Sequence, residues 1–181
     1  SLLAEELIIT LFQYDAFDAL SAKKTSLSLK AYGSGLMAFI AIKIFAPIFL
    51  SRGDTKTPVK AGVVAMVSNI VLNLILVRYF DHIGLAAATS ISALVNAAIL
   101  YFFLIKQSIF KFHNTFYKML VKVIFAVTIM SLYIYYFDSS ISLYLESSLL
   151  ERTILISKTI AISIAIYFLT LYALGVRFKQ L

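Results

Sequence analysis

The sequence predicts an all-α membrane protein, a polytopic helix bundle with five complete transmembrane helices and a truncated helix before them. Of the 181 residues, 61% are hydrophobic and only 14% are charged, and the mean hydropathy is +0.94. A soluble domain has about 45–50% apolar and about 25% charged residues. The chain therefore has too little polar surface for a soluble globule. It also holds several apolar stretches of about 20 residues, the length that crosses a bilayer.

Short polar connections separate the hydrophobic stretches. The first stretch, residues 2–12, carries two glutamates and is too short to span a membrane. Complete spans are expected over the ranges 31–50, 58–77, 83–105, 119–137 and 153–176. Only the connections at 106–118 and 138–152 are longer, and neither has room for a soluble catalytic domain.

The start of the chain predicts that more sequence precedes it. The first residue is Ser1, and half of a hydrophobic helix follows it without a signal peptide. We therefore expect the C-terminal part of a longer protein, with the N-terminal half missing. The alternative for residues 2–12 is a short amphipathic helix that lies in the membrane interface.

Charge asymmetry between alternate loops predicts the orientation. The formal net charge is +7. Nine Lys and Arg residues lie in 52–60, 106–122 and the C-terminus, and six lie in the alternate segments at 23–30, 78 and 152–158. Because cytoplasmic loops carry the excess of Lys and Arg, we expect a cytoplasmic C-terminus and an external 138–152 loop. Loops explain the basic excess, so no nucleic-acid partner is expected.

Lys43 lies inside the first complete span, where an ammonium group must face a cavity, find a partner or reach toward the interface. Pro47, four residues later, lacks the N–H that would bond the Lys43 carbonyl. The two residues are candidates for a cationic cavity wall that faces an anionic substrate. A snorkelling lysine beside an ordinary helix kink is an equally good interpretation.

Polar side chains form stripes on the second and third complete spans. Asn69 and Asn73 share one helix face, and Thr89, Ser92 and Asn96 share a face of the next span. Carboxamide, hydroxyl and carbonyl oxygens are suitable ligands for Na⁺ or a similar cation. Hydrogen bonding between helices is the more ordinary use of such residues, and it is favoured because no carboxylate lies nearby.

The connection between the first two complete spans has the pattern of a turn into a helix. Thr57 is placed to cap that helix, and Pro58 suits its first position. The segment is either a capped cytoplasmic turn or a gate contact. Its candidate residues are Arg52, Asp54, Lys56, Thr57 and Pro58.

Enzymatic motifs are missing from the sequence. It contains no HExxH, GxSxG or P-loop motif, and its two histidines, His82 and His113, are single loop residues. The absence of cysteine removes thiol nucleophiles and cysteine metal ligands. No enzyme, firm metal site or bound cofactor is therefore predicted.

An ordered series of motifs resembles the C-terminal half of the MurJ/MviN family. The resemblance rests on the runs YGSGL at 32–36, KIFAP at 43–47, RGDTKTPVK at 52–60 and NIVLN at 69–73. LFQYDAF at 11–17 is similar to the family's loop after its ninth helix, and HIGLA at 82–86 is similar to the entry of its twelfth. Beyond residue 106 only hydropathy and loop length match.

The resemblance implies a fourteen-helix bacterial inner-membrane transporter with both ends in the cytoplasm. Members of this family are lipid II flippases of peptidoglycan and cell wall synthesis, within a superfamily that includes MATE-type drug and polysaccharide exporters. In them, two bundles rock around a cationic cavity. Residues 1–105 then correspond to the end of helix nine and helices ten to twelve. Residues 106–181 correspond to helices thirteen and fourteen, which form a groove for the polyprenyl tail.

The resemblance carries over only some site residues. Lys43 matches a lysine of the family pattern, whereas the cavity arginines of the family have no counterparts in this chain. Some members bind sodium at the positions of Asn69, Asn73, the Leu85 carbonyl and Thr89. The carboxylate at the position of Asn73 in those members is an amide here, and the helix-seven ligand is missing. Membrane potential or protons are then the alternative energy sources.

Three functions remain open from the sequence. The first is part of a lipid II flippase that moves the polyprenyl-diphosphate precursor by alternating access. The second is a related drug or polysaccharide exporter, and the third is a non-transporting membrane scaffold that contacts cell wall synthesis or division proteins. The expected partners of the flippase are lipid II, membrane lipids and the missing N-terminal half.

Overall fold

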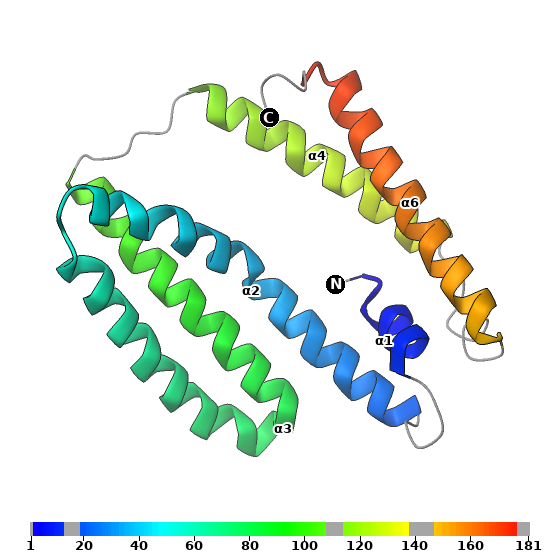
Figure 1. Cartoon of the computed structure of the whole chain (residues 1–181), viewed down its shortest axis with the longest axis horizontal. Helices are drawn as coiled ribbons and strands as arrows, with labels where there is room; N and C mark the ends of the chain where they lie inside the picture. The colour runs from blue at the N-terminus through cyan, green and yellow to red at the C-terminus, as the bar shows by residue number, and fades with distance from the viewer. Residues whose placement is uncertain (1, 13–18, 108–113, 138–146, 177–181) are drawn as a thin grey trace. The chain divides into compact units, whose positions relative to one another are not determined.

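The computed structural model describes residues 2–12, 19–107, 114–137 and 147–176, and these residues form helices joined by turns. Five helices are described: α1 (Ala4–Phe12), α2 (Ala19–Ser51), α3 (Lys56–Lys106), α4 (Asn114–Phe137) and α6 (Leu149–Ala173) (Figure 1). Four of them, α2, α3, α4 and α6, are long and apolar enough to cross a membrane. The all-helical membrane prediction is therefore confirmed.

Helix α3 is a hairpin rather than one straight rod. As a straight helix its 51 residues would be about 76 Å long, more than twice the thickness of a hydrocarbon core of about 30 Å. The backbone leaves helical geometry at Asp81, with φ 48° and ψ −129°, and the chain turns back there (Figure 1). We call residues 56–80 the first arm and residues 82–106 the second arm. They contain the predicted spans 58–77 and 83–105.

Gly84 allows the two arms to meet closely beside this reversal. A Cβ atom at Gly84 would collide with the Leu76 carbonyl oxygen and would lie 3.0 Å from the Val77 nitrogen. Both of those atoms belong to the backbone of the first arm, so they cannot move aside as a flexible side chain would. Small residues commonly permit such close approach between membrane helices.

The chain divides into two compact units, and the first consists of α2 from Lys23 onward together with α3. In this unit α2 contacts the hairpin through two small cores. One core joins Phe49 of α2 to Ala61, Leu100 and Leu104, and the other joins Ala38 of α2 to Ala93 and Ala97. The outward side chains are largely apolar and exposed, as expected where lipid surrounds a helix.

Helix α2 and the second arm cross most closely at Gly35. The Ser90 hydroxyl donates a hydrogen bond of 2.7 Å to the carbonyl oxygen of Ala31 on α2. A Cβ atom added at Gly35 would lie 2.6 Å from the Ser90 Oγ atom and 2.8 Å from its Cα atom. The hydrogen bond and the glycine together fix the crossing of these two helices.

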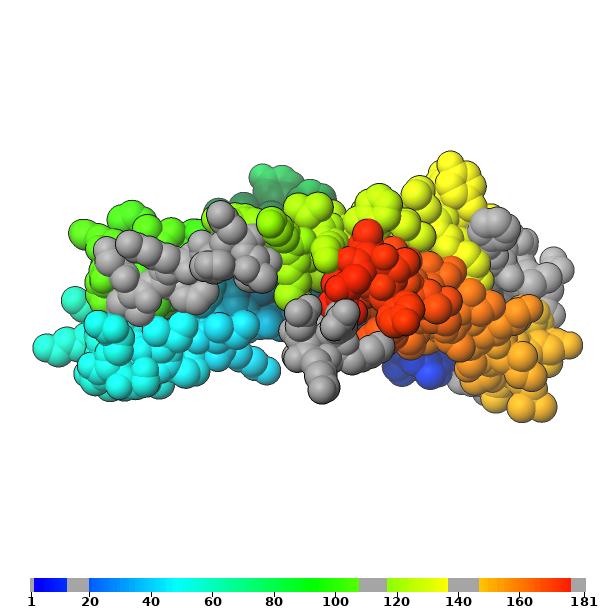
Figure 2. Space-filling model, turned by 90° about the horizontal axis from the view of Figure 1, so that it is seen from above, coloured from blue at the N-terminus to red at the C-terminus, as the bar shows by residue number. Residues whose placement is uncertain are grey.

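The second unit contains α1, the first residues of α2, α4 and α6. Helices α4 and α6 lie side by side (Figure 1, Figure 2), and they share a core of Ala126, Leu171 and Val176. Helix α1 contacts α6 through a second core, whose buried members are Ile8, Ile9, Ala22 and Ile156. The predicted stub at 2–12 is thus helical.

Several helix bounds differ from the predicted spans for local reasons. Helix α6 begins at Leu149 instead of 153, because Ser148 and Glu151 form a capping box in which the Ser148 N–H donates to the Glu151 carboxylate at 2.8 Å. It ends at Ala173, and Gly175 then adopts a φ of +73°. Helix α2 begins at Ala19 instead of 31, since lysines end a hydropathic stretch but not a helix.

The Gly35 crossing can be tested with a single methyl group. We expect Gly35→Ala to lower the free energy of unfolding by about 1–3 kcal/mol, because the new Cβ atom overlaps the Ser90 backbone. Gly62→Ala is the matched control, since no atom lies within 4 Å of a Cβ atom at that position. Denaturant unfolding in detergent measures both. Equal stabilities of the two variants would contradict the proposed close crossing.

Candidate functional site

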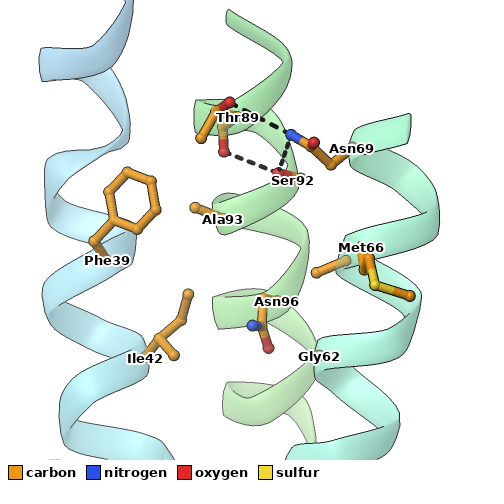
Figure 3. Close-up of a pocket in the computed structure, with 10 residues that line it drawn as sticks. Phe39, Ile42, Gly62, Met66, Asn69, Thr89, Ser92, Ala93 and Asn96 are labelled. Carbon is orange, nitrogen blue, oxygen red and sulfur yellow. Dashed lines mark hydrogen bonds between the residues drawn. The ribbon is translucent and has the colours of Figure 1, made fainter. Parts of the chain in front are cut away.

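A hydrogen-bonded cluster joins the two arms of α3 within the membrane-spanning part of the hairpin (Figure 3). The Asn69 side-chain amide donates to the Thr89 hydroxyl at 3.4 Å and to the Ser92 hydroxyl at 3.2 Å. The Asn73 side-chain amide, one turn further along the first arm, donates to the side-chain oxygen Oδ1 of Asn69 at 3.0 Å. Two of these contacts connect residues 20 and 23 positions apart in the sequence, and the third connects residues one turn apart on the same arm.

The second arm holds the acceptors of this cluster in place. The Thr89 hydroxyl donates to the Leu85 carbonyl oxygen at 2.9 Å, and the Ser92 hydroxyl donates to the Thr89 carbonyl oxygen at 2.9 Å. Each hydroxyl proton is therefore used within the helix, and the oxygen lone pairs face Asn69. We call Asn69, Asn73, Leu85, Thr89 and Ser92 the Asn69 network.

The structure brings together the four residues that the resemblance pairs in a cation site. Asn69, Asn73, Thr89 and the Leu85 carbonyl form one continuous chain of hydrogen bonds. Ser92 joins them, although our site prediction omitted it. The signal was present in the sequence, because Ser92 shares a helix face with Thr89.

The donor set of the Asn69 network does not fit a sodium ion well. Within the described residues, no group of three or more His, Cys, Asp or Glu side chains could hold a metal. The Thr89 and Ser92 hydroxyl oxygens each already accept one hydrogen bond from the Asn69 amide, which leaves a single lone pair on each for a cation. Asn73 Oδ1 is the remaining buried acceptor of the network without a partner in the described part of the chain. The arrangement fits a bond between helices better than a metal site.

A pocket of about 410 Å³ opens beside the network, between α2 and both arms of α3 (Figure 3). Its polar side chains are those of Asn69, Thr89, Ser92 and Asn96. Its other lining residues are Phe39, Ile42, Gly62, Ala65, Met66 and Ala93. Asn96 lies one turn after Ser92 on the second arm, so the polar face continues past the network into this pocket.

Lys43 and Pro47 lie apart from the Asn69 network. Both residues are exposed on α2, while the neighbouring Ile42 lines the pocket and Phe49 is fully buried in the α2–α3 core. Helix α2 continues through Pro47 to Ser51. The cationic candidate and the polar candidate are therefore separate features of this unit.

The turn between α2 and α3 differs from the predicted cap. Helix α3 begins at Lys56, so Thr57 and Pro58 are its second and third residues, and the expected cap by Thr57 is wrong. Thr55 occupies the N-cap position without a side-chain cap bond, and the Asp54 carboxylate before it accepts the Thr57 hydroxyl at 2.6 Å and the Thr57 N–H at 3.0 Å. These bonds lower the pKa of Asp54. Arg52 and Lys56 are exposed at the same turn.

Comparison with known proteins gives a consistent family match. The family model described as "Lipid II flippase MurJ" matches residues 1–155. A "Probable lipid II flippase MurJ" of Vibrio cholerae is 36% identical over 179 residues, which cover 99% of this chain and 34% of that relative. The corresponding protein of Haemophilus influenzae is 36% identical over 177 residues, which cover 98% of this chain and 34% of that relative. A "Lipid II flippase MurJ" of Burkholderia cenocepacia is 28% identical over 179 residues, which cover 97% of this chain and 34% of that relative. The chain spans about a third of the length of these relatives.

The Asn69 network predicts a measurable stability effect. We expect Asn69→Ala to lower the free energy of unfolding by about 1–2 kcal/mol, because two hydrogen bonds between helices and one to Asn73 are lost. Thr128→Val is the control, since its hydroxyl donates to the Ile124 carbonyl of its own helix. Denaturant unfolding in detergent compares them. A loss for Asn69→Ala no larger than the loss for Thr128→Val would refute the network's role.

Proposed function

Because the chain belongs to the MurJ lipid II flippase family, we propose that it works as part of a lipid II flippase that operates by alternating access. The observation that carries this proposal is the family match over residues 1–155 of the 181. The family is one of transporters rather than enzymes, and its members are multi-pass proteins of bacterial membranes. The polar chemistry of the described residues, inside apolar helices, is in keeping with such a role.

The chemistry of the proposed substrate sets what the protein must provide. A lipid-linked head group with phosphates cannot cross hydrocarbon unaided, because each buried charge loses its hydration. The head group needs a hydrated, cationic path, while the tail stays in apolar surroundings. Alternating access provides this path by exposing one cavity first to one side of the membrane and then to the other.

The first unit is suited to move as one piece during such a cycle. The Asn69 network ties the two arms of α3, and the bond from Ser90 to the Ala31 carbonyl ties the second arm to α2. Packed helices that are joined in this way tend to shift as a body rather than deform. We assign α2 and the α3 hairpin to one rocking bundle of the transporter.

We assign Lys43 to the substrate cavity, together with Pro47 one turn further along α2. Its side chain is exposed, so its ammonium group is available to a phosphate. The turn with Arg52, Asp54, Lys56, Thr57 and Pro58 is assigned to a cytoplasmic gate, where the Asp54–Thr57 bonds hold the turn in shape.

Helices α4 and α6 are assigned to the polyprenyl tail. Their outward side chains include exposed apolar residues along both helices, such as Val121, Phe125, Ile164 and Leu169. An apolar groove between such helices accepts an isoprenoid chain without a polar cost. The boundary that we place between residues 105 and 106 separates this part from the rocking bundle.

The proposed topology has five membrane crossings, made by α2, the two arms of α3, α4 and α6. The C-terminus and the Asp54 turn lie in the cytoplasm, and the reversal at Asp81 lies outside, in agreement with the distribution of Lys and Arg. The protein sits in the inner membrane and works together with the remainder of a longer chain. We propose membrane potential or protons as the energy source, because position 73 offers an amide and not a carboxylate.

Depletion of the intact protein tests the flippase proposal. We expect lipid II to accumulate in the inner leaflet, so that an external lipid II-cleaving toxin no longer reaches it. The measurement is the toxin-released product in cells that carry no second flippase, with re-expression of the wild-type protein as the control. Unchanged release after depletion would favour the scaffold hypothesis.

Substitution of Lys43 tests its place in the cavity within the same assay. We expect Lys43→Ala in the full-length protein to reduce rescue strongly, because an exposed cation that meets the phosphates is lost. Lys43→Arg keeps the charge and should retain most of the rescue. Full rescue by Lys43→Ala at equal expression would remove this residue from the cavity.

A further inference from the structure

The pocket beside the Asn69 network contains an acceptor that the network does not satisfy. The Oδ1 atom of Asn96 is buried, yet it makes no hydrogen bond with any of the described residues. Buried polar atoms nearly always have a partner, either in the protein or in ordered water. In the middle of a membrane helix the missing bond is especially unfavourable, because lipid tails cannot replace it.

The neighbouring polar groups cannot serve as that partner. The Thr89 and Ser92 hydroxyls donate to carbonyl oxygens of their own arm, and the Asn69 amide donates to both hydroxyls. Their protons are therefore already committed. The partner of Asn96 Oδ1 therefore lies outside the described residues and must donate a hydrogen bond, and the pocket that Asn96 lines is the open space beside it.

The pocket has the size and chemistry for small neutral molecules. Its volume is about 410 Å³, whereas one water in the liquid occupies about 30 Å³. None of its ten lining residues is charged, so an anion finds no cation there. A cation would need several free oxygens, whereas the Thr89 and Ser92 hydroxyl oxygens each accept one hydrogen bond from Asn69 and keep a single lone pair. Water, which both donates and accepts, meets these conditions.

The pocket is also open beside Gly62, its lining residue on the first arm that has no side chain. A Cβ atom at Gly62 would have no other atom within 4 Å, in contrast to Gly35 and Gly84, where neighbouring atoms crowd the position. Gly62 thus faces free volume opposite Asn96 (Figure 3). An apolar side chain at this position would have filled the pocket.

We propose that this pocket is a binding site for ordered water, centred on Asn96 and continuous with the Asn69 network. Water there satisfies Asn96 Oδ1 and links it to Ser92, one helical turn away on the same arm. The seam between α2 and the α3 hairpin is then hydrated along this polar face, although the three helices are apolar outside. This inference does not depend on which substrate the protein moves.

The test uses a thiol as a local probe of water. The chain contains no cysteine, so Gly62→Cys places a single thiol in the pocket of a full-length protein kept free of other cysteines. Val63→Cys is the matched control, since it lies at nearly the same depth, is exposed and does not line the pocket. Only a hydrated thiol ionises and reacts readily with a small, water-soluble thiosulfonate. Ala65→Cys, in the same pocket, is a second probe.

We expect Gly62→Cys and Ala65→Cys to react at least about tenfold faster than Val63→Cys in lipid nanodiscs. Adding Asn96→Leu should bring the Gly62→Cys rate down to that of Val63→Cys, because the water loses its anchor. Equal rates for the pocket and control thiols, or no effect of Asn96→Leu in a protein of normal elution and thermal stability, would overturn the proposal. Slower reaction in sodium than in choline at equal ionic strength would also overturn it, in favour of a bound cation.

Discussion

The hydrogen bonds from Asn69 to Thr89 and Ser92 are the interaction on which the first unit depends. Within a bilayer, polar side chains have no water to bond, so they must find partners in the protein. The Asn69 amide finds them on the opposite arm of α3, which requires the chain to reverse at Asp81 and to approach closely at Gly84. Helix α2 then joins the paired arms at Gly35 through the Ser90 hydroxyl.

The two units differ in the chemistry that they offer. The first carries the Asn69 network, the pocket with Asn96 and the exposed Lys43, whereas α4 and α6 of the second are apolar along most of their length. A transporter of a lipid with a phosphate head group needs both kinds of surface, polar for the head and apolar for the tail. This division supports the role that we propose for a chain of the MurJ family.

Hydropathy and residue spacing predicted the main features of the fold and part of the site. Apolar stretches located each long helix that the structure describes, and the i, i+4 spacing of Asn69 and Asn73 predicted their shared face, because both patterns follow from helix geometry alone. Spacing along the chain could not determine which side chain meets which across two arms. The Asp54–Thr57 bonds and the early start of α6 at Leu149, after the Ser148 cap, depend on side-chain bonds that the hydropathic pattern does not contain. The orphaned oxygen of Asn96 likewise emerges only when three helices are placed together.

The most direct test of this account is the distance between the two arms of α3. Spin labels at Val63→Cys and Phe102→Cys, both at exposed positions, can be measured by pulsed electron paramagnetic resonance in nanodiscs. Adjacent helices of a hairpin lie about 8–10 Å apart, so with label arms we expect a distance under about 30 Å. A straight α3 would separate the two positions by about 58 Å, and a distance near that value would contradict the hairpin and the Asn69 network together.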